Sequence, residues 1–205
     1  MGELKNVIKT LFNLQTQIFL IVETLNEIGN NYQVLRKIKL ENFFDKSMNF
    51  EVSSHTLLSN YSIIMFSSFI EEYDKYFNPS HLSGIDSLRI IKVKEKNRAG
   101  MKRIRMWKDI SRFRNHMVAH SFRFKNKSFF SEDMEELRFK IPNKISEKNL
   151  FAGIAHLICL NIRDEFIECV TAFDNNQVML DKMKLIGEDI DNEKELIELY
   201  AQMRS

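Results

Sequence analysis

The chain has 205 residues, of which 44% are hydrophobic and 28% are charged, and its net charge is +2. This length suits one domain, and the apolar content excludes a disordered chain. The longest apolar runs fall far short of the roughly 20 residues of a membrane span, and the opening MGELKNVIKTL lacks the pattern of a secretory signal. We therefore expect a soluble, cytoplasmic protein with no membrane partner.

The N-terminal half is predicted to be helical, because only two Pro and six Gly interrupt the whole chain. Residues 29–31 (Gly-Asn-Asn) are expected to stop or kink a first helix. A resumed helix over 32–39 remains an open alternative. Residues 40–54 are mixed, and the run from 55 to 77 is apolar almost all round until Asn78-Pro79, so we predict a central buried helix there. The apolar positions of the first helix, mostly three or four residues apart, are Leu4, Val7, Ile8, Leu11, Ile18, Val22 and Leu25.

A strongly basic segment follows a loop that contains Gly84. Residues 89–127 hold 14 Lys or Arg against two acids, Glu95 and Asp109, so this segment carries a formal charge of +12 and the rest of the chain carries −10. Gly100 is expected to separate two helices, the second beginning near Met101. Such a block is either a solvated helix face paired with the acidic remainder or a surface that binds a polyanion.

The C-terminal half is predicted to contain one long helix and an extension. Residues 122–142 are the least helical, and Ser146 is expected to cap a helix that runs to about residue 173. Cys159 and Cys169 fit neither a CxxC pair nor a zinc knuckle and are expected to be buried thiols. We therefore divide the chain into a helical domain, 1–173, and an acidic amphipathic helical extension, 174–205.

The sequence RFRNHMVAHSF, residues 112–122, lies inside the basic segment. On one continuous helix, Met106, Ile110, Phe113 and Met117 would form the buried stripe. Arg114 and His120 would then lie about 9 Å apart along the axis and about 120° apart around it. Only the reach of the Arg side chain, a fraying helix end or a second copy would bring both to one phosphate.

Three interpretations of this motif remain open. In the first, His120 is a core-edge histidine near a helix C-terminus and Arg114 belongs to a basic face. In the second, His116 and His120 bind zinc, but the glutamate of HExxH is absent and no third ligand is indicated, so we expect no metal and no cofactor. In the third, His120 exchanges a proton with a ribose 2′-OH or a leaving 5′-oxygen while Arg114 stabilises charge on phosphorus.

The stretch RNHMVAH resembles the signature of the HEPN superfamily (higher eukaryote and prokaryote nucleotide-binding domain), in which an Arg, usually followed by a polar residue, precedes a His by four to six intervening residues. Here five residues intervene and the polar residue is Asn115. The position of the motif late in one helix, before a long apolar helix, is also similar. The resemblance implies an all-α, HEPN-like helical bundle with additional C-terminal helices.

The same resemblance implies a homodimeric, metal-independent endoribonuclease, either a toxin with an antitoxin partner or a phage-defence effector. Its catalytic residues would be Arg114, His120 and Asn115, with Glu72 and His116 as orienting candidates. The alternative is a non-catalytic HEPN-like module that binds RNA, a nucleotide or a protein. The expected RNA-binding residues, all basic and close to the motif, are Lys102, Arg103, Arg105, Arg112, Arg123, Lys125 and Lys127.

Overall fold

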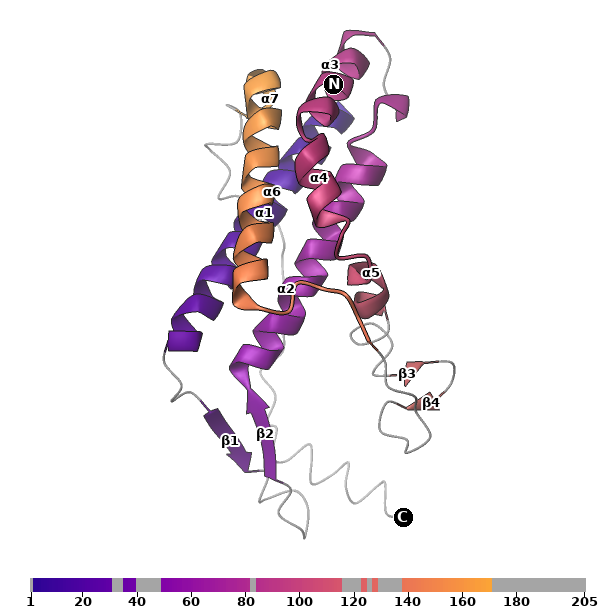
Figure 1. Ribbon diagram of the computed structural model, residues 1–205. Coiled ribbons are helices and arrows are strands. Elements are labelled where there is room, and N and C mark those ends of the chain that lie inside the picture. Colours follow the sequence, from indigo (N-terminus) through magenta and orange to yellow (C-terminus); the bar gives the residue numbers. More distant parts are fainter. Residues whose placement is uncertain are drawn as a thin grey trace, which may run out of the picture. The chain divides into compact units, whose positions relative to one another are not determined.

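The structure is a computed structural model that describes residues 2–30, 35–39, 49–81, 84–115, 123–124, 127–128 and 138–170 (Figure 1). Helices make up most of these residues, which confirms the predicted helical class. Within these ranges, no helix is long and apolar enough to cross a bilayer. The predicted extension, 174–205, lies outside the described residues.

Three long helices form the centre of the fold. Helix α1 (Gly2–Asn30) packs against both α2 (Ser54–Glu71) and α6 (Ile145–Glu165), as Figure 1 shows. The seven apolar residues predicted to form the inner face of the first helix are all buried. Helix α2 continues as a π-helical turn, η1 (Glu72–Tyr76), close to the predicted end of the central helix. Periodic spacing therefore identified the packed face of α1 correctly.

The basic segment begins with two short helices that follow η2 (Pro79–His81). Helix α3 (Ile85–Lys96) is joined to α4 (Arg98–Ile104) at Asn97, so the break predicted at Gly100 is wrong. Gly100 instead lies within α4, where an added Cβ would meet Cγ2 of Ile154 at 3.0 Å. The absence of a side chain at this position therefore suits the close packing of α4 against α6.

Two short antiparallel pairs accompany the helices. Strand β1 (Leu35–Lys39) pairs with β2 (Asn49–Ser53), so the alternative of a resumed helix over 32–39 is wrong. Ile38 stands opposite Phe50 in this pair, and both residue types favour strands. Strands β3 (Arg123–Phe124) and β4 (Lys127–Ser128) pair within the segment that was predicted to be least helical.

Helix α6 begins one residue before the predicted cap, Ser146. The carboxylate of Glu147 accepts hydrogen bonds from the backbone N–H groups of Asn143 and Lys144, which satisfies donors at the helix start. The helix ends at Glu165, and a short α7 (Ile167–Val170) follows after Phe166, so the predicted continuous helix is interrupted at Phe166. Cys159 and Cys169 are buried free thiols, as predicted.

Lys148 is a buried cation near the start of α6. Only 2% of it is exposed, and its Nζ donates to the carbonyl oxygens of Pro142 and Asn143 at 2.6 and 3.2 Å. Burial lowers the pKa of Lys148 from 10.5 to about 8, although the neighbouring carboxylate of Glu147 opposes this shift. The ammonium therefore ties the segment before α6 to the helix at a cost in desolvation.

This lowered pKa predicts a pH effect on stability. The folded protein releases the Lys148 proton near pH 8 and the unfolded chain near 10.5, so the unfavourable contribution of the buried charge fades as pH rises through 8. Between pH 7 and pH 9, the free energy of unfolding of the wild type should rise by about 1.4 kcal/mol more than that of the Lys148→Met variant. Urea denaturation of both proteins at each pH measures this difference; a constant difference would contradict the assigned environment.

Candidate functional site

Arg114 follows a four-residue helix, α5 (Ile110–Phe113), which is separated from α4 by a turn over 105–109. The predicted continuous helix from Met101 into the motif is therefore wrong, and so is part of its buried stripe. Ile110 is buried, but Met106 is 53% exposed and Trp107 is buried instead. In this turn, Met106 N donates to Arg103 O and Trp107 N donates to Ile104 O, so each bond spans three residues instead of four. Because these bonds wind the backbone more tightly, the following residues no longer keep the angular positions that a continued α4 would give them.

The segment before α6 holds this turn and α5 in place. Asp109 N donates to Lys140 O at 3.2 Å, and Lys140 N donates to Asp109 Oδ2 at 2.8 Å. The rings of Phe113 and Phe139 pack edge to face with centroids 5.4 Å apart. Because residues 138–144 are themselves anchored through Lys148, the position of α5 is set by the core of the protein.

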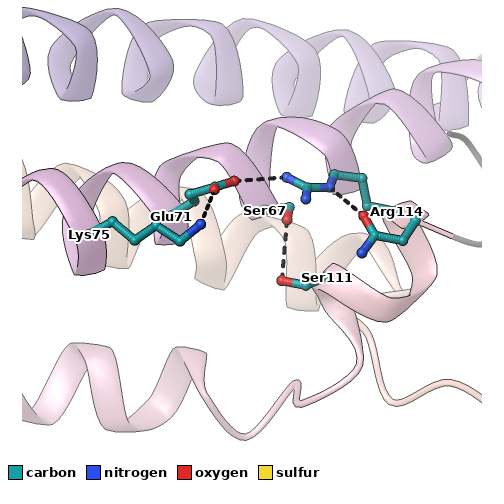
Figure 2. Close-up of polar contacts among 6 residues, drawn as sticks. Ser67, Glu71, Lys75, Ser111 and Arg114 are labelled. Carbon is teal, nitrogen blue, oxygen red and sulfur yellow. Dashed lines mark hydrogen bonds and ion pairs between the residues drawn. The ribbon is translucent and has the colours of Figure 1, made fainter.

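The Arg114 side chain is oriented by two oxygen acceptors. Its Nη1 donates to Oε2 of Glu71 on α2 at 3.1 Å, and its Nε donates to Oδ1 of the adjacent Asn115 at 3.2 Å. Figure 2 shows the guanidinium reaching from α5 toward Glu71. The side chain is 28% exposed, so it is partly shielded from solvent.

Glu71 is shared between two cations. Lys75, one turn further along, donates to Oε1 at 2.6 Å, while Arg114 occupies Oε2 (Figure 2). The hydrogen bond from Lys75, followed by that from Arg114, lowers the pKa of Glu71, so this carboxylate stays ionised at neutral pH. The three side chains together carry a net charge of +1. The hydroxyls of Ser67 and Ser111 lie 3.4 Å apart in the same region and also link α2 with α5.

Glu72, the predicted orienting acid, does not occupy this position. Neighbouring residues on a helix point about 100° apart, and only Glu71 lies on the side that faces Arg114. The backbone carbonyl of Glu72 accepts from Phe77 N at 2.9 Å, but its carboxylate has no hydrogen-bond or ion-pair partner among the described residues. Burial, followed by the charge of Glu71, raises the pKa of Glu72. The acid that contacts Arg114 is therefore Glu71, one position before the predicted Glu72.

The structure describes the remaining predicted residues unevenly. His116, His120 and Lys125 lie outside the described residues. Arg123 and Lys127 are placed only as backbone positions in β3 and β4. Lys102 is exposed at the surface.

Several Lys and Arg side chains of the basic segment pair with carboxylates or aromatic rings of the protein itself. Arg105 pairs with Asp74 at 2.8 Å, and the guanidinium of Arg103 lies 4.2 Å from the ring centroid of Trp107. Arg112 contacts the ring of Phe139 and lies 3.9 Å from Asp109. The interpretation of a helix face paired with the acidic remainder therefore holds for part of the segment. Other members with carboxylate partners are Arg89 and Lys92.

The arrangement around Arg114 is able to bind an anion. A guanidinium has five N–H donors, and two of them are used by Glu71 and Asn115. The other three have no acceptor among the described residues, and a tetrahedral phosphate offers oxygens at the spacing of such a fork. Arg114 is thus oriented, partly shielded from water and able to make further hydrogen bonds.

Comparison with known proteins adds no relative from which to read a role for these residues. The chain matches no protein-family model, no curated protein and no solved structure.

Proposed function

We propose that this protein is a metal-independent endoribonuclease of the HEPN type in which Arg114 and His120 cleave RNA at a cleft between two copies of the chain. The observation that carries the proposal is the orientation of Arg114 by Glu71 and Asn115, which leaves three of its donors without an acceptor among the described residues. The sequence resemblance supplies the second catalytic group, His120. As a cellular role, the resemblance supports a toxin or a phage-defence effector.

The reaction needs an acid–base group and a stabiliser of phosphate charge. The ribose 2′-oxygen attacks phosphorus and loses its proton, and the bond from phosphorus to the 5′-oxygen breaks as that oxygen gains a proton. His120 exchanges these protons, while Arg114 binds the negative charge that grows on the phosphoryl oxygens. The products are a 2′,3′-cyclic phosphate and a 5′-OH end.

Glu71 contributes by holding Arg114 in a productive direction. A lone carboxylate beside the guanidinium would repel a phosphate, but Lys75 offsets that charge. The net charge of +1 on Glu71, Lys75 and Arg114 favours an anionic substrate. Asn115 holds the second edge of the guanidinium, because its Oδ1 accepts a hydrogen bond from Nε of Arg114.

Substitution of Glu71 tests this positioning. Glu71→Ala should lower the rate of RNA cleavage by about 10- to 100-fold, because a misdirected guanidinium no longer meets the phosphate. Glu72→Ala is the matched control, since Glu72 is adjacent and does not contact Arg114. Single-turnover cleavage rates, with circular dichroism as a check of folding, measure the effect. Equal rates for the two variants would exclude a positioning role for Glu71.

The proposed activity is tested by incubating a mixed RNA pool with wild-type protein and with the double variant Arg114→Ala/His120→Ala. We expect cleavage by the wild type alone. If both proteins leave the pool intact, or degrade it at the same rate, the nuclease proposal fails.

A non-catalytic binding module is the second candidate, and one observation favours it. The Arg114–Glu71 pair and the Ser67–Ser111 contact also fasten α5 to α2, a structural task that requires no substrate. Such a module would keep salt-sensitive binding of RNA, a nucleotide or an acidic protein after His120→Ala and show no turnover.

A further inference from the structure

The backbone is π-helical on both sides of the Glu71–Arg114 ion pair. Helix α2 ends at Glu71, and the next five residues form the π-helical turn η1. Arg114 and Asn115 also have a π-helical backbone. Such turns are rare in proteins and occur frequently at functional sites. Because one follows Glu71 and the other contains Arg114, we looked for further ligand-binding side chains on η1.

A second cation, Lys75 of η1, lies beside Arg114. Its Nζ is 2.6 Å from Oε1 of Glu71, and Nη1 of Arg114 is 3.1 Å from Oε2 of the same carboxylate. Figure 2 shows Glu71 between the two cations. The Lys75 side chain is 66% exposed, against 28% for Arg114. Neighbouring phosphates of one strand are the closest pair of phosphates that RNA offers, so two cations that share a carboxylate suit consecutive phosphates.

The next residue, Tyr76, presents an aromatic ring to solvent. Tyr76 is 51% exposed, whereas Phe77 after it is fully buried. The hydrogen bond to Glu71, followed by the charge of that carboxylate, raises the pKa of Lys75. Smaller electrostatic effects of Tyr76 and Arg114 act on the same pKa, so both groups lie near the ammonium. An aromatic ring beside a cation suits a nucleotide, because the base stacks on the ring while the phosphate pairs with the cation.

We propose that Lys75 and Tyr76 bind the nucleotide next to the cleaved bond, and that the substrate is therefore a single strand of RNA. Lys75 contacts the phosphate adjacent to the one at Arg114, and a base stacks on the ring of Tyr76. The bases of a duplex are already paired and stacked on one another, so a duplex cannot place a base on this ring. Since stacking accepts every base, this subsite selects strand conformation and not sequence. The inference rests on the proposed function, in which Arg114 binds the phosphate at the cleaved bond.

RNA binding by the His120→Ala variant tests the subsite without cleavage of the probe. The probe is a fluorescein-labelled RNA of about 12 nucleotides without self-complementarity, used alone and annealed to its complement. Fluorescence anisotropy should show that the single strand binds at least about 10-fold more tightly than the duplex.

Substitution of Tyr76 in the same His120→Ala background tests the stacking. Tyr76→Ala should weaken binding of the single strand by about 5- to 100-fold, the range for loss of one stacked base. Tyr76→Phe keeps the ring and should retain the affinity. Tyr61→Ala is the matched control, because Tyr61 is a 44% exposed tyrosine of α2, and this variant should bind as the background does.

The salt dependence of binding distinguishes a phosphate contact of Lys75 from a structural role. Each phosphate contact to a single strand contributes about 0.7 to the slope of log affinity against log salt concentration. Lys75→Gln should lower the slope by about this amount, whereas Tyr76→Ala should leave the slope unchanged. Lys92→Gln is the matched control, because Lys92 is 59% exposed and pairs with Glu165 at 2.7 Å.

Cleavage of the same single strand by the wild type separates failure of this inference from failure of the proposed function. If the wild type cleaves, three results would overturn the inference alone. These are equal binding by Tyr76→Ala and Tyr61→Ala, an unchanged salt slope in Lys75→Gln, and equal affinity for single strand and duplex. If the wild type does not cleave and His120→Ala does not bind, the proposed function fails and the inference fails with it.

Discussion

Replacing Arg114 with Ala is expected to lower the rate of RNA cleavage by at least about 100-fold, the loss typical for one oriented donor to a developing oxyanion. The guanidinium is held by Glu71 and Asn115, so its orientation is defined before substrate arrives. Arg114→Lys should retain a smaller part of the activity, because an ammonium keeps the charge but loses the planar fork. Initial rates with a fluorescent RNA substrate measure both variants.

Arg163 provides the control for this experiment. It lies on α6, is 46% exposed and pairs with the adjacent Asp164, so Arg163→Ala removes a surface guanidinium away from Arg114. Its cleavage rate should equal that of the wild type. A cleavage rate for Arg114→Ala within about 3-fold of the wild type would remove Arg114 from the catalytic machinery.

Phe151→Ala is expected to lower the free energy of unfolding by about 3–5 kcal/mol, the usual cost of truncating a buried Phe. Phe151 is fully buried on α6, and its ring stacks on Phe66 of α2 with centroids 4.0 Å apart. Phe69 meets the same ring edge to face, and Trp107 packs against it at 6.0 Å. The cavity would therefore open where α2, α6 and the turn before α5 meet.

Leu157→Ala is the matched control, because Leu157 lies on the same helix but is 60% exposed. Its effect on the free energy of unfolding should stay within about 0.5 kcal/mol. Urea denaturation of the three proteins supplies the comparison. A small effect of Phe151→Ala would contradict the packing of α2 against α6.

The long helices were predictable because their packing repeats along the sequence. The inner face of α1 follows three- and four-residue spacing, and every predicted residue of that face is buried. The central helix and the long helix after Pro142 were also found from apolar runs and breakers. Such patterns involve residues close together in one helix, so the spacing of apolar residues along the sequence is enough to predict them.

The candidate site was less predictable because tertiary contacts decide its geometry. The turn over 105–109 is stabilised by hydrogen bonds between Asp109 and Lys140, which are 31 residues apart. Helical periodicity cannot predict contacts between residues so distant in the sequence. The choice between Glu71 and Glu72 depends on the angle at which α2 faces α5. The +12 segment likewise could not reveal that Arg105 pairs with Asp74 or that Arg89 pairs with Glu168.

The most direct test of the proposed function is cleavage of total cellular RNA in EDTA by wild-type protein and by His120→Ala, with analysis of the product ends. We expect cleavage by the wild type alone, leaving 2′,3′-cyclic phosphate and 5′-OH ends. Equal cleavage by the two proteins, or cleavage by the wild type only when a metal ion is supplied, would contradict the proposed function.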